Sequence, residues 1–374
     1  MNISFQVLFD CLSTEIDNMK KIKNPIIVFL IVMLALSSVS AAEADDEKDL
    51  FEPYSESFKN VRFEEEITQN GFVFIETQVF TIKHEKMGEL KLLPAIHKEF
   101  NRLAFFFASD DGYIVFKTDD FISNSWLKGQ ARQTNRDLVC LSFTDLNGDG
   151  LDDIIIISAC RNQFGIYADK TYQVADVLFQ SEEGFYRDPR ISDKLNRFDM
   201  NKTLDAIVAF VRDGVSMEFL FTAKDLAELY AHGFRPISNQ CFTEHFEKFG
   251  VVEIISGFFN LAGQNYLMIY ITDTAGKILW NFQPMHYYVN FYAISSISFR
   301  DIDGDGNKDI LLIGHYVTYD EDGLVIIKRD YDIYYQRAGY FLEDTQFKQS
   351  YSCGEDDDIG VITSKARQYW GWPQ

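Results

Sequence analysis

Two nine-residue segments, 145–153 and 301–309, carry residue types and spacings that could hold a metal ion. In each segment, side chains with oxygen atoms stand at positions 1, 3, 5 and 9, and glycine stands at positions 4 and 6. Calcium takes six to eight hard oxygen ligands, which a tight loop supplies from alternating side chains and a backbone carbonyl. The glycines permit positive φ angles that a Cβ would penalise. The candidate ligands are Asp145, Asn147, Asp149, Leu151 (through its carbonyl) and Asp153 in the first loop, and Asp301, Asp303, Asp305, Asn307 (through its carbonyl) and Asp309 in the second.

Other loop types fit these segments less well. An EF-hand needs a bidentate Glu at position 12, where this chain has Ile156 and Leu312, and it needs flanking helices. The apolar runs 154–157 and 310–313 instead indicate buried strands, which also disfavours a dockerin-type helix. The residue types alone allow a metal-free hairpin turn. However, the four carboxylates of 301–309 would repel one another without a cation. We therefore predict two Ca²⁺ sites.

A phenylalanine two residues before each loop (Phe143, Phe299) and the strand after it complete the pattern F-x-D-x-[DN]-G-D-G-x-x-D. This pattern resembles the FG-GAP/VCBS repeats that are also found in integrin α-chain headpieces, although it covers only two short segments directly. The resemblance implies a β-propeller in which some blades carry calcium-binding loops. It also implies binding of protein or carbohydrate, an inference from fold alone.

The N-terminal residues are typical of an export signal. Three lysines at 20–23 precede an apolar stretch over 25–36 and small residues over 37–44. These features predict a secretory signal peptide over residues 1–44, in which 1–18 are an upstream extension because signal peptides begin close to their basic residues. No later segment is apolar enough to cross a membrane. We expect an exported chain (secreted, periplasmic or at the cell surface), with an acidic tail over 45–60.

The composition limits both the fold and the partners. The net charge of −22 disfavours nucleic acids and anionic membranes and favours cations or basic partners. Aromatic residues make up 15% of the chain, proline is scarce, and short β-branched runs are frequent. These features predict an all-β domain over residues 61–374. We expect this domain to be a monomer.

Weaker copies of the loop motif suggest a repeat. The loop-equivalent positions fall near residues 101, 145, 199, 260 and 301, at intervals of about 40 to 60 residues, as expected for four-stranded blades. Six to seven blades would fill the domain. The copies near 199 and 260 have lost ligands or glycines and are not expected to bind calcium. A β-sandwich is the alternative fold, but a sandwich gives no reason for the repeat.

Local signals add details that a structure can test. An Asn-Gly pair at 70–71 predicts a hairpin between strands at 61–67 and 72–83, and residues 223–230 have helical spacing. Cys140 and Cys160 flank the first loop and form the favoured disulfide, with buried free thiols an equally good explanation.

No catalytic set stands out in the sequence. The six histidines lack metal-binding or triad spacing, and no nucleophile or phosphate-loop motif is present. Aromatic clusters at 286–288, 334–335 and 369–372 could stack on sugars or pack between blades. The sequence therefore predicts an exported, calcium-stabilised β-propeller that acts as a protein- or carbohydrate-binding and adhesion module. The alternative is a secreted polysaccharide lyase or glycosidase on the same scaffold.

Overall fold

The computed structural model describes residues 52–124, 126–127, 131–162, 171–288, 290–319 and 324–373. The chain divides into two units, residues 1–62 and 63–374. The signal peptide expected over 1–44 lies outside the described residues. Residues 52–60, within the acidic tail expected over 45–60, are helical. No helix among the described residues has the length and apolar character needed to span a bilayer.

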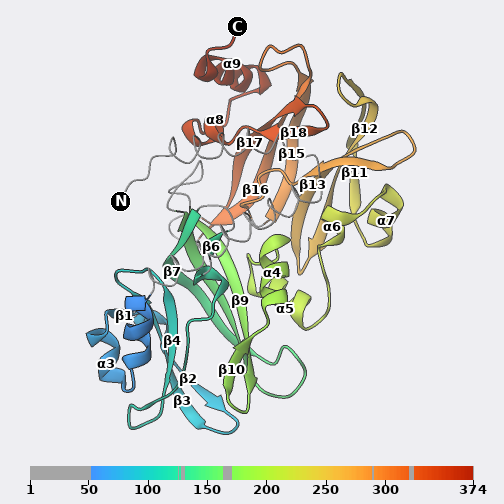
Figure 1. Ribbon diagram of the computed structural model, residues 1–374. Coiled ribbons are helices and arrows are strands. Elements are labelled where there is room, and N and C mark those ends of the chain that lie inside the picture. The colour runs from blue at the N-terminus through green and yellow to red at the C-terminus, as the bar shows by residue number, and fades with distance from the viewer. Residues whose placement is uncertain are drawn as a thin grey trace, which may run out of the picture. The chain divides into compact units, whose positions relative to one another are not determined.

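The second unit is built mainly from four antiparallel sheets that follow one another along the chain (Figure 1). Neighbouring strands in each sheet are mostly consecutive in sequence. The first two sheets contain β1 (Phe72–Phe74), β2 (Phe80–His84), β3 (Gly88–His97), β4 (Leu103–Ala108) and β5 (Ile114–Thr118), then β6 (Trp126–Leu127), β7 (Ala131–Thr144), β8 (Asp153–Asn162), β9 (Thr171–Ser181) and β10 (Gly184–Arg187). The third and fourth contain β11 (Arg235–Phe246), β12 (Gly250–Leu261), β13 (Gln264–Thr272) and β14 (Ile278–Phe282), then β15 (Asn290–Arg300), β16 (Asp309–Tyr319), β17 (Val325–Arg337) and β18 (Tyr340–Glu343).

Helices occupy the chain between and after the sheets. Four α-helices separate the second sheet from the third, and two follow the fourth sheet. The described residues therefore form four sheets, fewer than the six to seven blades expected, because these stretches are helical. The short helix predicted over 223–230 is confirmed. The helices are α3 (Glu64–Gln69), α4 (Pro189–Arg197), α5 (Leu204–Val211), α6 (Phe219–Thr222), α7 (Leu226–Ala231), α8 (Thr345–Ser350) and α9 (Ile359–Trp370), with 3₁₀ turns η1 (Glu76–Gln78) and η2 (Ile122–Asn124).

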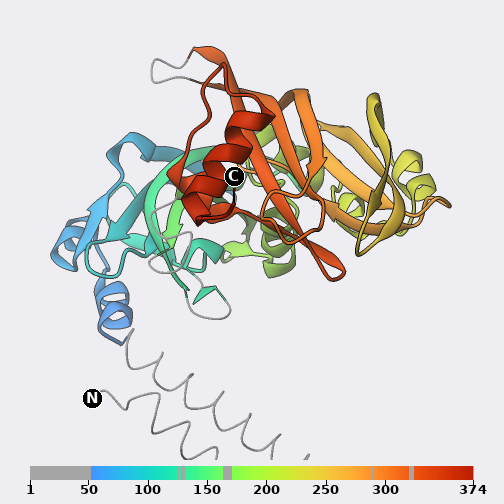
Figure 2. The ribbon, with the colours of Figure 1, turned by 90° about the horizontal axis from the view of Figure 1, so that it is seen from above.

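The apolar runs after the two loops explain how the sheets stack. In β8, Ile154 and Ile156 join a core with the first sheet, whereas the alternate residues Ile155 and Ile157 join a core with α4–α7 and the third sheet. Because side chains alternate across a strand, a continuous apolar run buries both faces of its sheet. Likewise, residues 310–313 in β16 alternate between the third sheet and α8–α9. Figure 2 shows α9 beside the outer face of the fourth sheet.

The strand predicted at 61–67 and the loop copy near residue 199 both lead to helices instead. Residues 64–69 form α3, which begins with three glutamates, and Glu66 accepts a hydrogen bond from the Phe63 N–H. Acidic residues in the first turn favour a helix over the expected hairpin strand. The degraded loop copy near residue 199 leads into α5 rather than a strand, because Thr203 caps the helix by accepting the Ala206 N–H.

The hairpins near residues 101 and 260 are also not equivalent to the two acidic loops. They join β3 to β4 and β12 to β13. If the short edge strands β1 and β6 are left out, these are the second and third strands of their sheets. The acidic loops join β7 to β8 and β15 to β16, which are the first and second strands by the same count. The repeat expected at every sheet is therefore wrong, and the unit that recurs is a pair of sheets whose second member carries the loop.

The favoured Cys140–Cys160 disulfide is not formed. Cys140 lies opposite Ile157 across the β7–β8 ladder, whereas Cys160 lies opposite Asn135. This offset along the strands holds the two sulfur atoms too far apart for a bond. Cys140, Cys160, Cys241 and Cys353 are all free thiols, the alternative that the sequence left open.

A buried carboxyl in β9 gives the fold a pH dependence that can be measured. Asp176 is 2% exposed, accepts hydrogen bonds from the Ile122 N–H (2.9 Å) and the Ser192 hydroxyl (2.7 Å), and lies 3.8 Å from Arg187. Burial raises the pKa of this carboxyl from 3.8 to about 7. Between about pH 4 and pH 7, the folded protein therefore keeps a proton on Asp176 that the unfolded chain has lost. The free energy of unfolding falls as pH rises through that window.

We expect Asp176→Asn to remove this dependence, because the amide stays neutral. Between about pH 4.5 and about pH 7.5, the stability of the variant should rise relative to the wild type by on the order of 3 kcal/mol. Urea denaturation of both proteins at each pH, in the same buffer and calcium concentration, measures the difference. Parallel pH curves would show that Asp176 is charged in the folded protein throughout.

Candidate metal sites

Each predicted loop forms a hairpin turn between two buried strands. The first joins β7 to β8, and the second joins β15 to β16. Neither loop is flanked by helices, so the EF-hand and dockerin alternatives do not apply. The two loops also occupy the same position in their sheets. The structure thus places the ten predicted ligands in two matched turns.

The aspartate at position 1 holds each turn closed. In the first loop, Asp145 accepts hydrogen bonds from the N–H groups of Gly148 (2.7 Å) and Gly150 (2.9 Å). Both glycines have positive φ, 80° and 83°, which other residues adopt only with strain. In the second loop, Asp301 accepts the corresponding bonds from Gly304 (2.7 Å) and Gly306 (3.0 Å). The glycines are therefore required by the conformation of the turn.

The aspartate at position 9 is buried and ties the turn to the sheet. Asp309 is fully buried and accepts hydrogen bonds from the Ile302 N–H (2.7 Å) and the Gln336 N–H (2.9 Å). Asp153 accepts the matching bonds from Leu146 and Gln180, both at 2.9 Å. Burial raises the pKa of Asp153, and it raises that of Asp309 to about 7. A buried carboxylate is costly without a nearby positive charge, and a metal ion would provide one.

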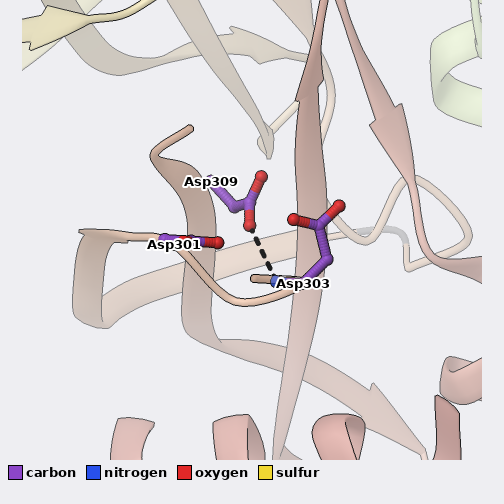
Figure 3. A group of neighbouring side chains, drawn as sticks. All are labelled: Asp301, Asp303 and Asp309. Atoms are coloured by element: carbon purple, nitrogen blue, oxygen red, sulfur yellow. Dashed lines mark hydrogen bonds between the residues drawn. The ribbon is translucent and has the colours of Figure 1, made fainter. Parts of the chain in front are cut away.

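Three carboxyl groups converge in the second loop (Figure 3). One oxygen each from Asp301, Asp303 and Asp309 lies within 4.8 Å of the others, and the Asp303 N–H lies 3.4 Å from an Asp309 oxygen. Asp305 follows, and its Oδ1 accepts the Asn307 N–H at 2.8 Å. Ligand atoms at this spacing could coordinate one ion. All of the side-chain ligand atoms are oxygens, which suits a hard cation such as Ca²⁺.

The first loop has the same plan with one fewer acid. Asn147 stands at position 3, and its amide donates to Asp149 (2.9 Å), while its oxygen accepts the Asp149 N–H (3.1 Å). The Leu151 N–H donates to Asp149 at 2.8 Å, as Asn307 does to Asp305. An ion here would have three carboxylates, from Asp145, Asp149 and Asp153, whereas the second loop offers four.

Sequence reasoning missed a glutamine that supports each loop. Gln180 and Gln336 each lie 27 residues after the ninth loop residue, a matched spacing that would have identified them. The Gln336 amide donates to the carbonyl of Lys308 (2.7 Å), and its oxygen accepts the Lys248 N–H (2.6 Å) in the β11–β12 turn. Gln180 makes the same pair of contacts with the Asp152 carbonyl (3.0 Å) and the Glu85 N–H (2.8 Å). Each glutamine therefore connects a loop to the preceding sheet.

Two arginines, Arg337 and Arg367, contact the second loop. Arg337 donates to Asp303 at 3.0 Å and lies 3.5 Å from an Asp305 oxygen. Arg367, in α9, donates to the carbonyls of Asp301 (2.9 Å) and Ile302 (3.1 Å). The second loop is thus part of the surface on which the C-terminal helix packs.

The aromatic clusters singled out in the sequence make mainly internal contacts. Tyr287 and Tyr288 donate to Asp330 (2.7 and 2.9 Å), which also pairs with Lys348. Tyr335 donates to Asp344, as does Trp370 through Nε1 (2.8 Å). These contacts join sheets and helices, the packing role that the sequence allowed. Tyr287 and Trp370 remain 44% and 38% exposed.

The two buried histidines have structural roles. Nδ1 of His84 accepts the N–H groups of Lys86 and Met87, both at 3.2 Å. Nδ1 of His97 accepts those of Glu99 (3.3 Å) and Phe100 (3.4 Å). Each ring closes the turn that follows it.

Comparisons with known proteins leave the chain unassigned. No protein-family model and no curated protein matches it. A fructofuranosidase from Schwanniomyces occidentalis is 10% identical over 68% of this chain and 42% of its own, with a TM-score of 0.20. An exotype rhamnogalacturonan lyase is 13% identical over 70% of this chain and 48% of its own, with a TM-score of 0.19. The chain spans less than half of either structure, and likeness this weak assigns neither a fold family nor an activity.

Proposed function

We propose that this protein is an exported, calcium-stabilised binding module of the β-propeller type, with one Ca²⁺ in each acidic loop. The observation that carries the proposal is the matched geometry of two loops far apart in sequence. In both, the first aspartate closes the turn and the ninth is buried beneath it. A turn that needed no ion would have no reason to place acids at positions 1, 5 and 9 in both copies, since these acids repel one another.

The ions would act on stability rather than bind a partner directly. The carboxylates at positions 1 and 9 already accept hydrogen bonds from backbone N–H groups of their own turn. Through Gln180 and Gln336, each loop is linked to the preceding sheet. An ion that fixes the turn would therefore also fix the contact between two sheets, so folding and metal affinity would be coupled.

The ligand of the module is proposed to be a protein or a glycan. Exposed apolar side chains stand on the fourth sheet. Val325 and Ile327 on β17 are 65% and 49% exposed, and Tyr292 on β15, two strands away, is 61% exposed. Apolar groups exposed together on a folded chain are typical of interaction surfaces. The net charge of −22 favours a basic or neutral ligand.

The metal part of the proposal is tested by counting bound ions. Native mass spectrometry of the protein purified without chelator should show two Ca²⁺ per chain, and Asp145→Asn and Asp301→Asn should each remove one. No bound calcium and no calorimetric signal on titration would refute it. A glycan array and a pull-down of extracellular proteins then test the binding role. Release of sugar products from polysaccharides would instead support the enzyme alternative.

A further inference from the structure

The two loops differ at a pair of positions that contact each other only in the second. At position 3, Asn147 in the first loop corresponds to Asp303 in the second. The residue directly after the supporting glutamine is Ser181 for the first loop and Arg337 for the second. The Ser181 hydroxyl donates to the carbonyl of Gly184 (3.2 Å), within its own turn. Arg337 instead reaches the loop, so the extra acid of the second loop is accompanied by a cation from the chain itself.

Arg337 is held in contact with two predicted ligands. Its Nη2 lies 3.0 Å from Oδ2 of Asp303, and its Nη1 lies 3.5 Å from Oδ2 of Asp305. The Asp303 side chain is 7% exposed and that of Arg337 is 29% exposed, so solvent screens this pair incompletely. The guanidinium also donates to the Gln336 carbonyl (2.7 Å) and lies 5.5 Å from the centre of the Tyr335 ring. These contacts keep the positive charge beside the site.

We propose that Arg337 is an internal competitor of Ca²⁺ at the second loop, which makes the two sites unequal. This inference rests on the proposed calcium function. An ion at the second loop would share the carboxylates of Asp303 and Asp305 with the guanidinium and lie close to its charge. Within the described part of the chain, no cationic side chain contacts the acids of the first loop. The first loop is then the tighter site, which fills at lower calcium concentration. The second exchanges its ion at higher calcium concentration and keeps its carboxylates balanced when the ion leaves.

The opposite effect of Arg337 is also chemically reasonable and can be distinguished by its sign. Groups that hydrogen-bond to metal ligands often orient them, and losing such a group weakens metal affinity by about 10- to 100-fold. If Arg337 only orients Asp303, its removal would weaken the second site. If it competes with the ion, its removal would strengthen that site.

The test exchanges the two residues between the loops. In an Asp145→Asn background, which isolates the second site, Arg337→Ser should tighten Ca²⁺ binding by about tenfold or more, because a repelling charge is removed; competition with a chelating dye measures it. Arg337→Lys keeps the charge and should stay near the weak wild-type affinity. In an Asp301→Asn background, which isolates the first site, Ser181→Arg should weaken binding. Circular dichroism checks the fold of each variant.

Weaker or unchanged binding in Arg337→Ser would overturn the inference, and so would unchanged binding in Ser181→Arg. The second variant keeps the question open to measurement if the first one misfolds. The outcome for the proposed function is separate. If the wild-type protein binds no calcium, the function itself fails, whereas two ions of equal affinity that ignore Arg337 would refute only this inference.

Discussion

Asp309→Ala is expected to lower the free energy of unfolding by about 3 to 5 kcal/mol, even in the absence of calcium. The Asp309 carboxyl is fully buried and accepts the N–H groups of Ile302 and Gln336, whose side chains are also buried. Alanine would leave both donors without a partner, and each such group costs about 1 to 3 kcal/mol. Urea denaturation in excess chelator measures the loss without any contribution from metal binding.

Asp305→Ala is the matched control for this experiment. It removes the same charge from the same loop, but the Asp305 side chain is 38% exposed and accepts one backbone N–H, that of Asn307. Its loss in chelator should be below about 1 kcal/mol, because water can replace the carboxyl. Equal losses from the two variants would mean that the loop is loose without its ion and that Asp309 does not tie it to the sheet.

The same substitution in the first loop, Asp153→Ala, should have a similar effect, since its acceptor pattern is the same. This agreement between distant segments was visible in the sequence. Side chains at positions 1, 3, 5 and 9 with two glycines define a turn almost completely, because every requirement lies within nine residues. The strands after the loops were predicted for the same reason, as continuous apolar runs such as 154–157 can be read locally.

The parts that the sequence did not reveal depend on contacts between distant residues. The matched spacing points to Gln336, but the contact that it makes appears only when the β11–β12 turn, 88 residues earlier, lies against it. The sheet count failed because residues 204–211 are apolar enough for a strand, and the Thr203 cap and the surrounding core favour a helix. The Cys140–Cys160 pair failed because strand register cannot be read from spacing alone.

Removing calcium is expected to lower the melting temperature by about 8 °C. Each site filled at 100 times its dissociation constant adds about 2.7 kcal/mol of stability, so two sites add about 5 kcal/mol. A domain of this size shifts by about 1.5 °C per kcal/mol. The effect should reach the whole domain, because each loop is joined through its glutamine to the turn of the preceding sheet. Scanning calorimetry in calcium and in chelator measures the shift.

The Asp145→Asn/Asp301→Asn double variant is the control and should melt at the same temperature in both solutions. Magnesium should not replace calcium, because it prefers stricter octahedral geometry and keeps its waters. If the wild-type protein melted at one temperature in calcium and in chelator, the turns would be held by hydrogen bonds alone, and the acids would need another explanation.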